Sequence, residues 1–329
     1  MIKKYAFISG HYSENMLKYG QLEEKGAGID NRFRAFCKEH AYFSFTEAFE
    51  YFALLGGAPF AFDPLDSPHT IALHRIPENF DTFRLSIYPS YVLQKPYRDM
   101  LIAVAKGDGK RYAAMRKARM GERTGERIEE ELSALGMLYT ETSREAPLRQ
   151  YPKQKIKKEL RRYRIQDKLR FVSPFYRFWF GFVEPFASEL EKGEAQRYRD
   201  YFQAHYERLY SLLFEQLADA FLCRYFHTRD PVISRGSYWN KENEFDILAV
   251  TQSGRLLLGE CKYTSRPVCK SEFGKLRHKA AQAGIAVDTY VLFSKSGFSN
   301  ELKATANNET LLLFDTEDMA SLCYEEAGR

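Results

Sequence analysis

Four charged side chains stand in two apolar stretches of this 329-residue chain. Glu244 and Asp246 open the run Glu-Phe-Asp-Ile-Leu-Ala-Val, and Glu260 and Lys262 close the run Leu-Leu-Leu-Gly-Glu-Cys-Lys. In a β-strand, residues two apart project from the same face, so each stretch presents one charged pair on one face. Placing such charges among core residues costs free energy unless they pair or bind a metal, and folding alone does not ask for them there.

Two carboxylates at close range suit a hard divalent cation such as Mg²⁺, or Mn²⁺ in its place, which takes oxygen ligands and keeps several waters. A lysine beside the metal can orient the attacking water, assist its deprotonation and offset charge that develops on a phosphate. The spacing therefore indicates metal-assisted phosphodiester hydrolysis, with Asp246, Glu260 and Lys262 as catalytic residues and Glu244 as a further metal ligand. The alternative is a structural ion pair between Lys262 and either Asp246 or Glu260 in a half-buried sheet.

The elements that must position these residues follow from the hydrophobic pattern after Pro231. Apolar runs and turn residues predict the strands 232–239, 244–251, 255–263, 288–294 and 310–314, with helices over 271–283 and 300–305. A Gln-Ser-Gly turn joins the second strand to the third, so we expect these two strands to be hairpin neighbours and to bring the four charged residues together. A long amphipathic helix, 195–226, precedes the sheet.

The upstream chain predicts mostly helices. Ser44 is expected to cap a helix over 48–55, the proline-rich stretch 60–96 is expected to be loop-rich, and the aromatic segment 171–186 is expected to be buried core. Three compact helices and a strand are expected next, at 97–105, 112–119, 122–135 and 137–140. This is the pattern of a winged helix-turn-helix, whose third helix usually enters the DNA major groove, although such domains also serve as protein contacts alone.

Charge is unevenly distributed along the chain. The net charge is +5, but residues 144–177 hold twelve Lys or Arg against three Asp or Glu, so this stretch carries +9 and the remainder −4. A basic stretch with interleaved tyrosines suits phosphate contacts, and a solvated surface is the alternative interpretation. The predicted nucleic-acid contacts in this stretch are Lys153, Lys155, Lys157, Lys158, Arg161, Arg162 and Arg164.

Other classes of protein fit poorly. The five cysteines are odd in number and widely spaced, which argues against a disulfide framework or a zinc knuckle. The basic N-terminus leads into polar residues rather than the apolar run of a signal peptide. The most apolar stretch, 171–186, is too short and too charged to span a bilayer. We therefore expect a cytoplasmic protein that does not associate with membranes.

The spacing of Asp246, then thirteen residues, then Glu260-Cys261-Lys262 resembles the PD-(D/E)xK nuclease signature on a restriction-endonuclease-like core. The predicted order of helix, three strands, helix and strand is also that of this core. The resemblance implies that a glutamate on the preceding helix completes the metal site, for which Glu215 is the candidate and Glu207 the weaker one. It also implies a phosphate contact from the following helix, at Lys275 or Lys279. The proline of the signature is replaced by Phe245.

Longer motifs narrow the resemblance. Residues 163–185, Tyr238-Trp239, 243–246 and 259–262 look like the uncharacterised C-terminal module of archaeal-type ATPases, which in that family follows a winged helix. Residues 47–59 resemble the small helical lid that ends the family's ATPase domain. The Gly-x-x-x-x-Gly-Lys-Ser/Thr loop that cradles nucleotide phosphates is absent from the chain, so ATP hydrolysis is not expected.

Together these patterns predict a multidomain α+β and α/β protein. Residues 1–96 form a helical, loop-rich region that is lid-like around 45–60, 97–143 a winged helix, 144–194 a basic connecting segment, and 195–329 a nuclease-like domain with a mixed central sheet. The expected activity is Mg²⁺-dependent DNA cleavage. The alternative is an inactive module that keeps the nuclease fold for binding DNA or a protein partner, such as an ATPase encoded elsewhere.

Overall fold

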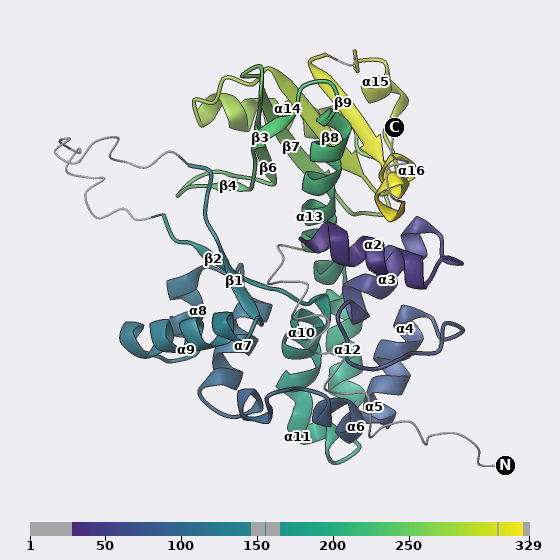
Figure 1. Ribbon diagram of the computed structural model, residues 1–329, viewed down its shortest axis with the longest axis vertical. Coiled ribbons are helices and arrows are strands. Elements are labelled where there is room, and N and C mark those ends of the chain that lie inside the picture. Colours follow the sequence, from purple (N-terminus) through teal and green to yellow (C-terminus); the bar gives the residue numbers. More distant parts are fainter. Residues whose placement is uncertain (1–27, 146–154, 156–164, 308, 325–329) are drawn as a thin grey trace. The chain divides into compact units, whose positions relative to one another are not determined.

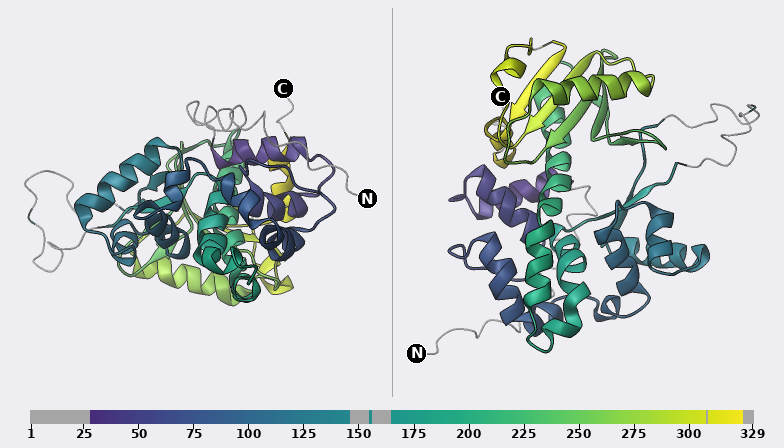
Figure 2. Two further views of the ribbon diagram at one scale, coloured as in Figure 1. Left: turned by 90° about the horizontal axis from the view of Figure 1, so that it is seen from below. Right: turned by 180° about the vertical axis from the view of Figure 1, so that it is seen from behind.

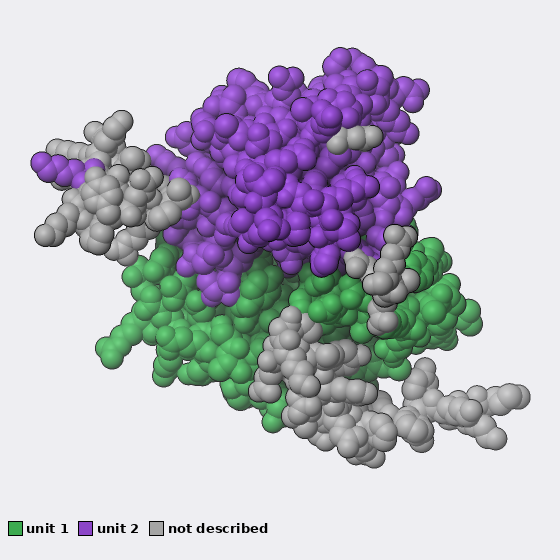
Figure 3. Space-filling view, turned by 45° about the horizontal axis from the view of Figure 1, so that its top comes forward, with its two compact units in different colours: residues 1–139, 169–210, 323–329 green, residues 140–168, 211–322 purple. Residues whose placement is uncertain are grey.

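The computed structural model of the protein describes residues 28–145, 155, 165–307 and 309–324 (Figure 1). The chain divides into two compact units, coloured separately in Figure 3. The helical unit comprises residues 1–139, 169–210 and 323–329, and the sheet unit comprises residues 140–168 and 211–322. The protein is thus a mixed α/β protein with a helical N-terminal region and a mixed sheet in its C-terminal part, and the finer domain assignments stay predictions.

The helical unit begins with two helices, and the start of the second matches its sequence signal. Its described helices before the three-helix segment are α2 (Ile29–Glu39), α3 (Phe45–Leu55), α4 (Pro68–Thr70), α5 (Ile76–Glu78) and α6 (Phe80–Leu85). Helix α3 starts at a capping box, in which Ser44 Oγ accepts from Glu47 N and Ser44 N donates to Glu47 Oε2 at 2.8 Å. The predicted helix start at Ser44 is confirmed.

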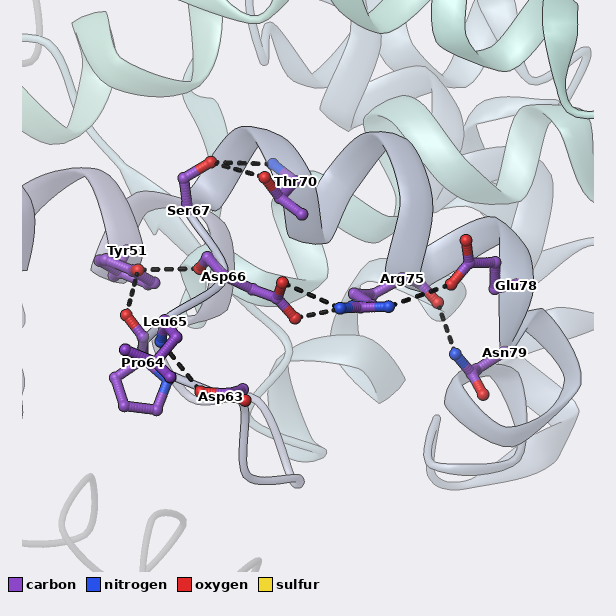
Figure 4. A network of polar contacts seen from close by, with 10 residues as sticks. All are labelled: Tyr51, Asp63, Pro64, Leu65, Asp66, Ser67, Thr70, Arg75, Glu78 and Asn79. Atoms are coloured by element: carbon purple, nitrogen blue, oxygen red, sulfur yellow. Dashed lines mark hydrogen bonds and ion pairs between the residues drawn. The ribbon is translucent and has the colours of Figure 1, made fainter. Parts of the chain in front are cut away.

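The stretch 60–96 is expected to be loop-rich, and the structure shows more helix there than its prolines indicate. A π-helical turn (Ile71–Arg75) joins α4 to α5, and Pro68 begins this helical segment at a position where a missing N–H costs nothing. The turn before α4 is fixed from two sides, as Figure 4 shows. Tyr51 Oη donates to the carbonyl oxygen of Asp66 at 2.8 Å, and Arg75 Nε pairs with the Asp66 carboxylate at 2.6 Å.

The aromatic segment 171–186 is buried, as predicted. It forms α10 (Pro174–Phe178) followed by a π-helical turn, and the side chains of Phe178 and Trp179 are fully buried in the core of the helical unit. Glu184 follows them and is also fully buried. Its carboxylate accepts from Arg98 Nε at 2.7 Å and from the Trp179 indole N–H at 3.1 Å, so the buried charge is neutralised and hydrogen-bonded.

Three compact helices and a strand follow one another in the region expected to be a winged helix. They are α7 (Tyr97–Lys106), α8 (Arg111–Lys117), α9 (Glu122–Ala134) and β1 (Leu138–Glu141), and β1 pairs with β2 (Lys168–Phe171). Helix α9 packs closely on α8 because Gly125 leaves room for Met115, whose Sδ would lie 2.7 Å from an added Cβ. The residue pattern predicted these elements to within two residues at each end, while the winged-helix assignment itself stays a prediction.

The rest of the helical unit is α11 (Ala187–Leu190) and α12 (Gln196–His205). The single helix expected over 195–226 is two helices, since α12 stops before Tyr206 and α13 (Glu207–Phe226) begins after it. Among the described helices, none is both long and apolar enough to cross a membrane.

The sheet unit is built on a five-stranded mixed sheet in the order β3-β6-β7-β8-β9. Its described elements are β3 (Val232–Ser234), β4 (Tyr238–Trp239), β5 (Glu244–Phe245), β6 (Ile247–Thr251), β7 (Leu256–Lys262), α14 (Lys270–Gln282), β8 (Thr289–Ser294), α15 (Asn300–Lys303), β9 (Leu311–Asp315) and α16 (Thr316–Met319). Strand β6 is antiparallel to β3 and β7, whereas β7, β8 and β9 run parallel. The predicted hairpin of the second and third strands is confirmed as β6 and β7.

Two of the predicted strands are interrupted. The strand expected over 232–239 breaks at Gly236, whose φ of +147° is a conformation that other residues rarely adopt. The strand expected over 244–251 breaks at Asp246, which lies in a bend between β5 and β6. Strands β4 and β5 then pair with each other as a separate two-stranded ribbon, with Trp239 opposite Glu244.

Helices cover both faces of the sheet. Phe221 of α13 makes edge-on ring contacts with Phe293 of β8, whereas Leu276 of α14 lies in one apolar cluster with Leu292. Because neighbouring residues of a strand point to opposite faces, α13 and α14 lie on opposite sides of the sheet, as the two views from front and behind also show (Figures 1 and 2).

Candidate functional site

The predicted catalytic residues meet where β5 gives way to β6. Ile247 pairs with Gly259 across the β6–β7 hairpin, so Asp246 comes next to Glu260 along the two strands. Asp246 is not part of the ladder. Its side chain takes the place of a ladder partner instead, because Asp246 Oδ2 accepts a hydrogen bond from the backbone N–H of Cys261 at 2.7 Å. The carboxylate of Asp246 is thereby fixed against β7 beside the Glu260 side chain.

Glu260 and Lys262 project from the same face of β7, as their spacing predicted. Lys262 Nζ lies 2.5 Å from Glu260 Oε1, and the two side chains are 34% and 20% exposed. Burial by itself lowers the pKa of the Lys262 ammonium, but the carboxylates of Glu260, Asp246 and Glu272 outweigh burial and raise it on balance. Lys262 is therefore an ammonium at neutral pH.

Glu215 of α13 joins this cluster electrostatically. Burial raises the pKa of the Asp246 carboxyl well above its usual range, and the nearby carboxylates of Glu215 and Glu260 raise it further. The Cys261 N–H and the Lys262 ammonium act in the opposite direction without cancelling the effect. The site thus places three carboxyl groups around one ammonium, and one of these carboxyls, that of Asp246, resists ionisation there.

An excess of carboxylate oxygens is the donor set that fits a hard divalent cation. Mg²⁺ commonly binds one or two protein carboxylates and keeps several waters, and Asp246 and Glu260 could supply the two, with Glu215 nearby. Within the described ranges, no three His, Cys, Asp or Glu side chains are arranged as a ready metal-binding group. The site therefore suits Mg²⁺ because its donors are carboxylate oxygens and because a cation would relieve the repulsion among them. Since Mg²⁺ keeps several waters, it does not need a complete set of protein ligands.

Glu244 does not join the cluster. Its carboxylate, 53% exposed, forms an ion pair with the ammonium of Lys168, which is only 1% exposed. The same ammonium lies 4.4 Å from the centre of the Trp239 ring. The sequence pattern predicted that Glu244 and Asp246 lie on the same face of one strand. The bend at Asp246 interrupts that strand, so the two side chains lie in different surroundings.

The predicted phosphate contacts are only partly within the described residues. Lys153, Lys157, Lys158, Arg161, Arg162 and Arg164 lie outside them, and Lys155 is exposed. Lys275 and Lys279 lie one turn apart on α14. Lys275 Nζ pairs with Glu272 Oε1 at 2.6 Å, and the half-buried Lys279 has its ammonium 4.9 Å from the centre of the Phe245 ring, next to Asp246 in the chain.

Two residues near the site were missed by the sequence analysis. Glu272 is on α14, acts on the Lys262 ammonium and binds Lys275, and its position three residues before Lys275 was the signal that could have found it. Lys168 was counted only as one of many cations in the basic stretch. No local signal distinguishes it, since its partner Glu244 lies 76 residues further along the chain.

Comparisons with known proteins give a limited result. A family model described as archaeal and bacterial proteins of unknown function (DUF234) matches residues 179–277, which include Glu215, Asp246, Glu260 and Lys262. No curated protein matches the chain significantly. One solved structure, protein VC1899 from Vibrio cholerae, is 13% identical, with a TM-score of 0.28 over 77% of this chain and 53% of that one. The chain thus spans about half of that protein, and a likeness this low does not establish a shared fold.

Proposed function

We propose that this protein is a Mg²⁺-dependent nuclease that hydrolyses phosphodiester bonds of DNA. The observation that carries the proposal is the desolvated Asp246 carboxyl beside Glu215 and Glu260, with the Lys262 ammonium 2.5 Å from Glu260. Three acids and one lysine in this arrangement also match what the resemblance to PD-(D/E)xK nucleases implies. Asp246 and Glu260 would hold the metal, and Glu215 would complete its surroundings.

Each residue then has a distinct task. A bound Mg²⁺ would polarise the phosphate and lower the pKa of a coordinated water. Lys262 would orient the water or a phosphoryl oxygen and stabilise the negative charge that develops there. Lys275 and Lys279 on α14 would contact backbone phosphates.

Helix α9 is a poor candidate for reading DNA. It carries five glutamates and only two arginines, a net charge of −3, whereas a helix in the major groove must approach two rows of phosphates. Arg111 Nε pairs with one of these acids, Glu129, at 2.5 Å, so α9 uses part of its charge within the helical unit. We therefore assign DNA contact to the sheet unit and to the basic stretch, and leave the winged-helix-like segment to protein contacts.

The test is nicking of supercoiled plasmid with Mg²⁺ or Mn²⁺. Glu260→Ala and Lys262→Ala should each lower the rate by about a hundredfold or more, because each removes a charge that acts on the transition state. Glu301→Ala and Lys303→Ala, at exposed positions of α15, are matched controls and should cleave like the wild type. Equal activity of the wild type, Glu260→Ala and Lys262→Ala would contradict the proposal.

A second function is favoured by one observation. The Lys262–Glu260 pair satisfies both charges without any metal. A descendant of a nuclease that binds DNA or a protein partner without cutting would retain such a pair. It would show salt-sensitive DNA binding, no cleavage, and indifference to Glu260→Ala, whereas a purely protein-binding module would show no DNA affinity at all.

A further inference from the structure

Lys168 is a buried lysine that folding alone does not explain. It is 1% exposed, and its ammonium pairs with Glu244 and lies over the Trp239 ring. Burying an ammonium costs several kcal/mol before pairing offsets it, and an apolar side chain of similar size often serves stability as well or better. Glu244 is 53% exposed and is already solvated, so it does not need a buried partner. The Lys168–Glu244 pair is better explained by a role in positioning neighbouring residues.

Trp239 is the fixed part of this arrangement. Its backbone N–H donates to Ser143 Oγ at 2.9 Å, and Ser143 Oγ donates to the Trp239 carbonyl oxygen at 2.6 Å. Its indole N–H donates to the carbonyl oxygen of Gln166 at 2.8 Å. Trp239 itself is 2% exposed. The Lys168 ammonium lies over the Trp239 ring and pairs with Glu244, which Trp239 faces across the β4–β5 ribbon.

Asp246 needs such support. It follows Glu244 by two residues and lies in a bend outside the regular ladder. Its side chain accepts a hydrogen bond from the Cys261 N–H at 2.7 Å. The β4–β5 ribbon leads directly into this bend, because β5 ends at Phe245 and β6 begins at Ile247.

We propose that Lys168, Trp239 and Glu244 form a clamp that positions the Asp246 carboxylate for metal binding. Glu244 is then a positioning residue that acts through the chain, rather than a ligand. The inference rests on the proposed function in one respect, since it takes Asp246 as the ligand whose placement matters. It predicts that removing the charge of Lys168 changes the rate of hydrogen exchange at the Cys261 amide, on the other side of the bend.

The first test is hydrogen exchange resolved at the Cys261 amide in metal-free protein. Lys168→Met keeps an apolar stem over Trp239 but removes the charge, and it should speed exchange at Cys261 by about tenfold while the Val291 amide in the centre of the sheet stays protected. Lys168→Arg keeps the charge and should restore slow exchange. Unchanged exchange at Cys261, or equal acceleration at Val291, would overturn the inference.

The second test is titration with Mn²⁺ alone. Residues that orient a metal ligand typically contribute ten- to a hundredfold to affinity, so Lys168→Met should weaken Mn²⁺ binding by about tenfold and Lys168→Arg should restore it. Faster exchange with unchanged Mn²⁺ affinity would overturn the positioning role. If the wild type itself binds no Mn²⁺, the proposed function is wrong. The positioning of Asp246 by the clamp is then tested by hydrogen exchange alone, since that measurement needs neither metal nor DNA.

Discussion

Asp246 is the residue where folding and the proposed chemistry conflict. Burial and the carboxylates of Glu215 and Glu260 raise its pKa, while the Cys261 N–H and Lys262 favour its anionic form. An acid whose pKa is raised by folding binds its proton more tightly in the native state than in the unfolded chain. Its ionisation therefore opposes folding at every pH above its unfolded pKa of roughly 4. The protein retains this unfavourable charge at the position where a metal would need it.

Asp246→Asn should consequently stabilise the metal-free protein at neutral and alkaline pH. Asn cannot ionise, yet its carboxamide oxygen can still accept from the Cys261 N–H, so we expect a higher free energy of unfolding than that of the wild type at pH 8. The gain should shrink as pH falls through the raised pKa and vanish near pH ~4, where Asp246 is neutral in both states. Urea denaturation in the presence of a chelator, at several pH values, measures this.

Asp288→Asn is the matched control for this prediction. Asp288 Oδ2 also accepts a backbone N–H, from Leu256 at 2.8 Å, but at the opposite end of β7 from Glu260 and Lys262. Its substitution should bring no comparable gain at pH 8. A destabilised Asp246→Asn protein at pH 8 would contradict the prediction that ionisation of Asp246 opposes folding.

At the scale of elements, the strands and helices of the sheet unit were predictable and their interruptions were not. Periodicity and turn residues define β7, α14 and β8, because these elements have continuous local patterns. The bend at Asp246 cannot be predicted from the sequence pattern, since polar and apolar residues alternate across it as they would in one continuous strand. The proline-rich stretch 60–96 misled for a related reason, because proline marks loops and helix starts alike.

The register of the β6–β7 hairpin can be tested at Gly259. An added Cβ there would lie 3.0 Å from Ile247 Cβ and 3.3 Å from Ile247 Cδ1, so the two strands could not keep their spacing. Gly259→Ala should destabilise the protein by about 1–3 kcal/mol. The loss should be smaller in an Ile247→Ala background, because the longer side-chain atoms are gone. Additive losses in the double variant would argue against this register.

The charge of individual helices makes a separate prediction about DNA contact. Replacing Arg123 and Arg127 of α9 by Gln should leave DNA affinity nearly unchanged, because this helix repels phosphate as a whole. Replacing Lys275 and Lys279 of α14 by Gln should weaken DNA affinity. It should also make the plot of log affinity against log salt less steep, by about one to two in slope. Fluorescence anisotropy across a salt series measures both effects. If the α9 substitutions lower DNA affinity more than the α14 substitutions do, α9 is the helix that contacts DNA.

For the whole molecule, the composition of the site was predictable, but the way it is supported was not. Asp246, Glu260 and Lys262 are close in sequence, so strand spacing and one hairpin bring them together. The Lys168–Glu244 pair joins residues 76 positions apart, and only the fold of the sheet unit shows that they meet. A basic residue within a basic stretch gives no sign that it is buried, and therefore its role could not be derived from pattern.

The division of charge in the whole chain leads to the last prediction. The basic stretch carries +9 and the remainder of the chain −4, so the proposed function assigns phosphate contact to the first and cleavage to acids in the second. Neutralising Lys155, Lys157, Lys158, Arg161 and Arg162 together should flatten the plot of log affinity for duplex DNA against log salt by about 4, since each phosphate contact contributes about 0.9. Glu260→Ala should leave that slope unchanged while abolishing cleavage. If instead Glu260→Ala weakens binding as strongly as the five neutralisations, the acids and the basic stretch serve a single binding surface, and the assignment of separate roles is wrong.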